Sequence, residues 1–186
     1  MYYKKTRILL EGKEIENELQ FFDNSDLPKL EKIYWSWVNL SNDLEKFGGR
    51  RINIPEILSE AIYCINFNAG RLTSNLGSGI KSSFDCWDKE RNTRIQVKAS
   101  SVKNDLTSFG PRSVWDELYF VHFFPNDTYD GSYSIYKIPN DLIYNHKVSK
   151  LQSFTDQQKQ NRRPRFSLIR EIIKPNKLTP LFESTF

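Results

Sequence analysis

The chain has 186 residues, of which 38% are apolar and 14% aromatic, so it can bury a sizeable core as one globular domain without disulfides. Its net charge of +4 is modest for a protein that binds nucleic acid unaided, and the basic excess is concentrated late in the chain. Residues 131–186 hold 10 basic and 4 acidic side chains, whereas residues 1–60 hold 9 and 11.

No window approaches the ~20 apolar residues that cross a bilayer, and no apolar signal run follows Met1, so we expect a cytoplasmic protein without a membrane anchor. The only cysteines, Cys64 and Cys86, lie in no spaced metal motif. We therefore expect two reduced core residues, which argues against a zinc site.

Three helices are expected in the N-terminal third. Residues 9–22 have apolar side chains at mixed three- and four-residue spacings, and residues 55–66 begin with a proline and gather apolar side chains on one side. Residues 27–47 have a regular stripe, which is most simply core: Leu30, Ile33, Trp37, Leu40 and Leu44. Tyr34 and Trp35 on its flank are alternatively a partner surface.

The remainder of the chain alternates short β-type runs with turns. Two runs, residues 83–87 and 94–100, are separated by a polar cluster and predict a hairpin. Further strands are expected at residues 114–124, 132–138 and 166–173, and a short helix at 140–145. The near-continuous apolar end of residues 114–124 predicts a central strand. The fold class is α/β, one domain over residues 1–186, with N-terminal helices (about 9–66) on a mixed sheet of about five strands.

The hairpin is expected to bring polar side chains together. Alternation along residues 94–100 places Gln96 and Lys98 on one face. If Asp88 pairs with Thr93, the register carries Asp85 directly opposite Gln96. Oxygen ligands of this kind suit Mg²⁺, and Lys98 would then stand beside an attacked phosphate. The alternative is an ordinary surface hairpin.

Asp85…Gln96-Val97-Lys98 resembles the core of the PD-(D/E)xK nuclease motif, although Phe84 replaces the usual proline and Gln96 the usual carboxylate. The resemblance implies a restriction-endonuclease-like fold, a catalytic core at about residues 50–174, and Mg²⁺-dependent hydrolysis of double-stranded DNA. The helix before the hairpin resembles the one that supplies a further metal-binding glutamate in this superfamily. Glu60 is the first candidate and Glu56 the second; a solvated glutamate is the alternative for Glu60.

Five arginines are candidates for DNA phosphate contacts, each with a solvated surface residue as the alternative. They are Arg50, Arg51, Arg162, Arg163 and Arg165. His122 and His146 lie in separate segments, so we expect structural roles for both and no histidine-based nuclease site.

Over its whole length the chain most resembles the small subunit of heterodimeric type IIS restriction enzymes. That resemblance implies a larger nicking subunit that recognises DNA, with this chain cutting the second strand. Three alternatives remain open: a self-sufficient homodimeric type II enzyme, a repair or junction nuclease, and a non-catalytic DNA- or partner-binding module.

Overall fold

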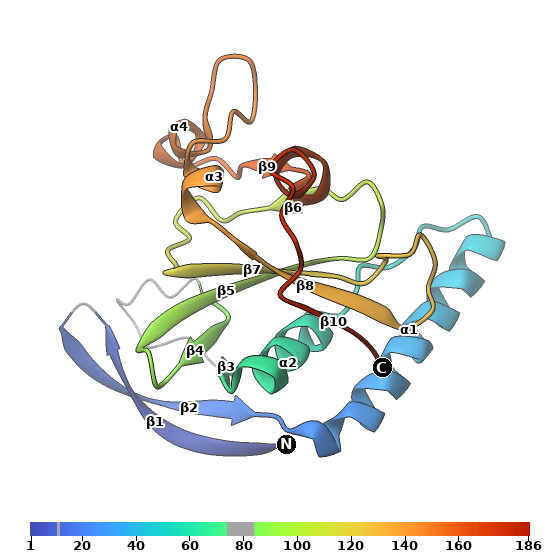
Figure 1. Cartoon of the computed structure of the whole chain (residues 1–186), viewed down its shortest axis with the longest axis horizontal. Coiled ribbons are helices and arrows are strands. Elements are labelled where there is room, and N and C mark those ends of the chain that lie inside the picture. The colour runs from blue at the N-terminus through green and yellow to red at the C-terminus, as the bar shows by residue number, and fades with distance from the viewer. Residues whose placement is uncertain (11, 74–83) are drawn as a thin grey trace.

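A single twisted sheet of eight strands runs through the computed structural model, which describes residues 1–10, 12–73 and 84–186 (Figure 1). The strand order is β1-β2-β3-β4-β5-β7-β8-β10, so the sheet is wider than the five strands expected. β5 and β7 pair in parallel and the other neighbours pair antiparallel. The strands are β1 Tyr2–Leu10, β2 Lys13–Phe21, β3 Gly70–Leu72, β4 Cys86–Asp88, β5 Thr93–Ser100, β7 Glu117–His122, β8 Ser132–Ile138 and β10 Phe182–Thr185.

The helix expected at residues 9–22 is wrong, because this segment belongs to a long β-hairpin. β1 and β2 pair along their whole length, from Tyr2↔Phe21 to Leu10↔Lys13. Gly12 lies in the connecting turn with a φ of +77°, which glycine adopts without strain. Burial along β1 alternates from Thr6 to Leu10, which is the period of a strand with one buried face.

The other two N-terminal helices are confirmed, as α1 (Leu27–Lys46) and α2 (Glu56–Phe67). They cover one face of the sheet, below it in Figure 1. The buried face of α1 is rotated from the expected stripe and consists of Leu30, Tyr34, Trp37, Val38 and Ser41. Tyr34 is therefore core, whereas Ile33 and Leu40 are exposed.

A second layer covers the opposite face of the sheet and comes mostly from the C-terminal part of the chain. It contains a two-stranded sheet of β6 (Thr107–Ser108) and β9 (Arg165–Phe166), with α3 (Asn140–Tyr144) and α4 (Phe154–Lys159). The prediction of a strand at residues 166–173 is wrong beyond Phe166, where β9 ends. A π-helical turn, η2 (Ile169–Ile173), follows instead, because the buried Asp105 carboxylate accepts the N–H groups that begin it.

The core is divided by the sheet. One cluster lies between the sheet and the two long helices, a second lies under the C-terminal layer, and a third packs against the β1–β2 hairpin. Cys64 and Cys86 meet in the first cluster, both free and buried as expected, with their Sγ atoms 3.6 Å apart. No helix within the described ranges is long and apolar enough to cross a membrane.

His122, at the end of β7, makes stability depend on pH. Burial lowers the pKa of His122 to about 4, against the opposing charge of Asp105. The unfolded chain therefore binds more protons between about pH 6.5 and 4, so the free energy of unfolding falls as the pH falls through this window. We expect the His122→Gln variant to lose about 2 kcal/mol of this pH-dependent change, measured by urea unfolding at a series of pH values. Equal slopes in the two proteins would contradict the prediction.

Candidate active site

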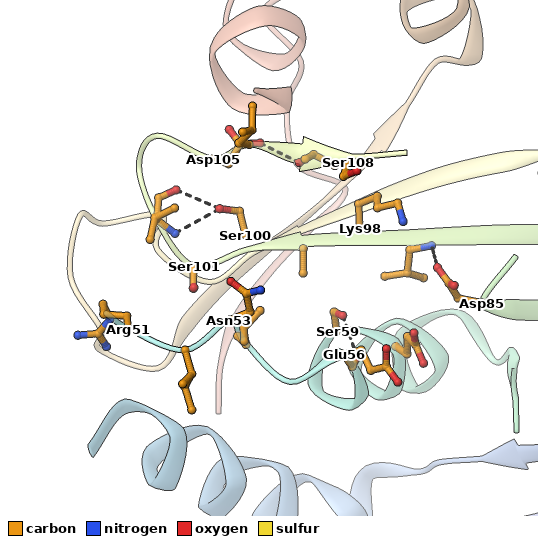
Figure 2. Close-up of a pocket in the computed structure, with 18 residues that line it drawn as sticks. Arg51, Asn53, Glu56, Ser59, Asp85, Lys98, Ser100, Ser101, Asp105 and Ser108 are labelled. Carbon is orange, nitrogen blue, oxygen red and sulfur yellow. Dashed lines mark hydrogen bonds between the residues drawn. The ribbon is translucent and has the colours of Figure 1, made fainter. Parts of the chain in front are cut away.

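A cleft opens where β4 stops. β4 pairs with β5 only from Cys86↔Ile95 to Asp88↔Thr93, and no described strand continues along this side of β5. A cavity of about 410 Å³ lies there, bounded by β5, the loop with Asp105 and Ser108, the start of α2, and residues 51–54 (Figure 2). The short partner strand therefore leaves both the edge and the side chains of β5 accessible.

Asp85 lies at the point where β4 ends, in the predicted register. Asp88 pairs with Thr93, and Asp85 donates its backbone N–H to the carbonyl of Ile95 at 2.9 Å. Its carboxylate Oδ2 accepts the N–H of Val97 at 2.8 Å and a hydrogen bond from the Gln96 amide. The Asp85 side chain thus takes the position of the missing strand and satisfies a backbone donor that would otherwise be orphaned.

Opposing effects act on the pKa of Asp85. Burial raises the pKa of Asp85, while the positive charge of Lys98 and the Val97 N–H lower it. Lys98 lines the same cavity, and its Nζ lies 5.9 Å from the centre of the Phe109 ring. The structure therefore brings the aspartate and the lysine of the hairpin to one cavity.

Glu60 projects from α2 into the same cavity. It is 8% exposed and forms an ion pair with Arg71 of β3. Burial and the negative charge of Asp85 raise the pKa of Glu60 to about 7, although Arg71 opposes the shift. Glu56 lines the cavity one turn earlier, but its side chain is 81% exposed and 3.6 Å from Arg71. The negative charge of Glu56 also raises the pKa of Asp85, so both glutamates interact with the aspartate, but only Glu60 is buried.

Gln96 lies behind Asp85, with 3% of its surface exposed. It holds the aspartate through its amide N–H, and turning the amide over would place the carbonyl oxygen beside the carboxylate instead. Within the described part of the chain, no group of three or more His, Cys, Asp or Glu side chains is placed to hold a metal ion. The carboxylates of Asp85 and Glu60 both line the cavity and are hard oxygen donors of the type that suits Mg²⁺, whereas Gln96 is not among the residues that line it.

The candidate arginines divide into two groups. Arg51 lines the cavity, but its Nη1 donates to Asn42 and Glu45, and its guanidinium lies 4.2 Å from the centre of the Tyr129 ring. Arg50 is exposed on the adjoining turn. The other three are exposed in the C-terminal layer, outside the residues that line the cavity: Arg162, Arg163 and Arg165.

Two polar residues of this region, the half-buried Arg71 and the buried Asp105, are missed by reasoning from the sequence. Arg71 comes from a three-residue strand with no recognisable pattern, and only the fold places it beside Glu60. Asp105 lies in a polar loop and, besides starting η2, accepts hydrogen bonds from Thr107 and Ser167. Asp105 thereby fixes the loop that forms the upper wall of the cleft in Figure 2.

Comparison with known proteins shows that this cleft belongs to a restriction endonuclease. The chain is a member of the Bsp6I restriction endonuclease family, whose model matches residues 22–175. It is 35% identical over 160 residues to the type II restriction enzyme Bsp6I of Bacillus sp. (strain RFL6), which spans 86% of this chain and 87% of that enzyme. No solved structure matches the chain. The matched residues include the whole cleft but not the β1–β2 hairpin.

Glu60 is expected to make the free energy of unfolding fall as the pH rises, which is the opposite of the pH dependence expected from His122. Because the pKa of Glu60 is raised from 4.5 to about 7, the folded chain binds more protons between these values, and stability falls as the pH rises through this window. In the metal-free protein we expect Glu60→Gln to remove about 2 to 3 kcal/mol of this change. Urea unfolding in EDTA between pH 4.5 and 7.5 measures the difference, and parallel curves for the two proteins would contradict it.

Proposed function

We propose that this chain is a Mg²⁺-dependent endonuclease that hydrolyses phosphodiester bonds of DNA in the cleft beside β5. The observation that supports the proposal is the meeting of Asp85, Glu60 and Lys98 at one cavity, in a member of a restriction endonuclease family. The β4–β5 hairpin supplies Asp85 and Lys98, and α2 supplies Glu60.

The carboxylates of Asp85 and Glu60, with the turned amide of Gln96, would hold the cation. When bound, Mg²⁺ supplies Lewis acidity at the phosphate and lowers the pKa of a bound water. The Val97 N–H fixes the Asp85 carboxylate, and Arg71 orients Glu60 while compensating its charge. These contacts hold the oxygen donors in place before substrate arrives.

Lys98 has the role of stabilising charge at the reacting phosphate. Its ammonium group donates to a phosphate oxygen and orients the water that attacks in line with the departing oxygen. In a cavity walled by protein, a fixed positive charge stabilises the developing negative charge more strongly than it would in bulk water. Lys98 follows Gln96 by two residues in β5. Because side chains alternate along a strand, the two lie on the same face of it.

Substitutions in the cleft are expected to abolish cleavage without unfolding the chain. Asp85→Asn keeps an oxygen acceptor for the Val97 N–H, and Lys98→Met keeps the apolar stem. We expect each to reduce the rate of DNA cleavage by at least about 100-fold, and EDTA to have the same effect, reversed by added Mg²⁺. Lys46→Met, which changes an exposed lysine paired with Asp43, is the matched control. Near-native cleavage by Asp85→Asn would refute the assignment.

Two assemblies are proposed for this activity. The resemblance noted in the sequence supports a small subunit that cuts one strand beside a larger DNA-recognising subunit, outside the recognised bases, as in type IIS enzymes. The alternative is a self-sufficient homodimeric type II enzyme, with which the match to 87% of the type II restriction enzyme Bsp6I is compatible.

Strand-resolved cleavage of a long duplex with Mg²⁺ distinguishes the two assemblies. A small subunit is expected to cut its strand only after the larger chain is added, and to elute as a monomer when alone. A homodimer is expected to cut both strands unaided and to have twice the monomer mass by light scattering. DNA affinity that survives Asp85→Asn and Lys98→Met, with no cleavage or metal dependence in any mixture, would instead identify a binding module.

A further inference from the structure

A small hairpin rises from the C-terminal layer between α3 and α4, drawn in orange at the top of Figure 1. Lys147 and Ser153 pair as an antiparallel bridge, and Ser149 and Gln152 exchange backbone hydrogen bonds of 3.2 and 3.4 Å. The tip of this segment, residues 146–153, therefore consists of Lys150 and Leu151. We call it the basic hairpin.

The base of the basic hairpin is firmly attached. The Gln152 side chain bonds to Gln160 at 3.0 Å and to Arg162 at 3.0 Å. Ser153 and Asp156 form a reciprocal capping box at the start of α4, and the next side chain, Phe154, is fully buried. The tip is thus presented by a short hairpin of two adjacent chain segments, closed by one isolated β-bridge.

The tip combines an exposed apolar side chain with a strongly basic surrounding. Leu151 is 92% exposed, and the two lysines of the hairpin are exposed beside it. Residues 146–165 contain six Lys or Arg side chains and one acidic side chain, an excess larger than the net charge of the whole chain. The cores of protein interfaces are depleted in lysine, so this composition favours a polyanion over a protein partner.

The basic hairpin belongs to the layer that walls the cleft. Arg165 of β9 pairs with Ser108 of β6, and Ser108 lines the cavity. Phe109, which lies beside Lys98, donates its N–H to the carbonyl of Pro164. The layer that carries the hairpin is therefore continuous with one wall of the cleft.

We propose that the basic hairpin enters the major groove of the DNA duplex, with Leu151 against the base edges and Lys147 and Lys150 on the flanking phosphates. A two-stranded ribbon fits the major groove, about 12 Å wide, but not the minor groove, about 6 Å wide. The apolar tip suits contact with a thymine methyl group. The inference rests on the proposed function and names the element that touches bases.

Binding measured in EDTA tests the hairpin separately from cleavage. Fluorescence anisotropy with a pool of labelled duplexes is compared for the native chain, Leu151→Ser and Lys150→Ala. We expect Leu151→Ser to weaken binding about tenfold with an unchanged salt dependence. Lys150→Ala is expected to lower the slope of log affinity against log salt by about 1. Phe47→Ser is the matched control, because Phe47 is 93% exposed at the end of α1, on the other side of the sheet.

Groove-specific blocking gives the second measurement. Bulky glucosyl groups in the major groove are expected to weaken binding of the duplex to the native chain at least as much as the Leu151→Ser substitution does. Distamycin, which fills the minor groove, is expected to leave binding unchanged. Native-like binding by both hairpin variants, or a change in oligomeric mass caused by Leu151→Ser, would overturn the inference alone. Failure of the native chain to bind any duplex would overturn the nuclease proposal with it.

Discussion

The hydrogen bond from the Val97 N–H to the Asp85 carboxylate is the contact on which the site depends. β4 ends after three residues, so β5 continues without its neighbour into the interior of the molecule. A buried N–H without an acceptor costs about as much as a lost hydrogen bond, and a carboxylate at the break satisfies it. The carboxylate that takes the place of the missing strand is thereby held, buried, beside the cavity.

Because β5 lies between two packed layers, its side chains serve both. Val97 faces the cluster between the sheet and α2, whereas Lys98 lies beside Phe109 of the opposite layer. The cleft therefore draws Glu60 from below the sheet and Lys98 from above it. Two basic side chains lie near the two acids there: Arg71 pairs with Glu60, and the charge of Lys98 lowers the pKa of Asp85. This balance allows a buried acidic pair to persist in the absence of a cation, at the cost of a raised pKa for each acid.

The local sequence predicts those parts of the structure whose causes are local. The polar cluster between two β-type runs predicts the hairpin register, which the pairing of Asp88 with Thr93 confirms, and proline followed by apolar periodicity predicts α2. The sequence of the β1–β2 hairpin predicts a helix because its few leucines and isoleucines fit the helical period as well as the strand period. The turn at Gly12 is the feature that distinguishes the two. The helical turn after Phe166 depends on Asp105, far away in sequence, as does the Arg71 contact on Glu60. No spacing rule reveals such distant partners.

The β1–β2 ribbon bears on how shortened versions of this enzyme would behave. The family match begins at residue 22, so a truncation designed from it would remove the ribbon. Ile8, Leu10 and Leu19 would be lost from their cluster, leaving Phe84 and Trp87 uncovered beside a newly exposed edge of β3. The present edge carries Lys4, Lys5 and Arg7, and a second β1 aligned against it would bring like charges together. The ribbon thus covers an apolar cluster and an open strand edge, and its removal would favour association between copies of the shortened core.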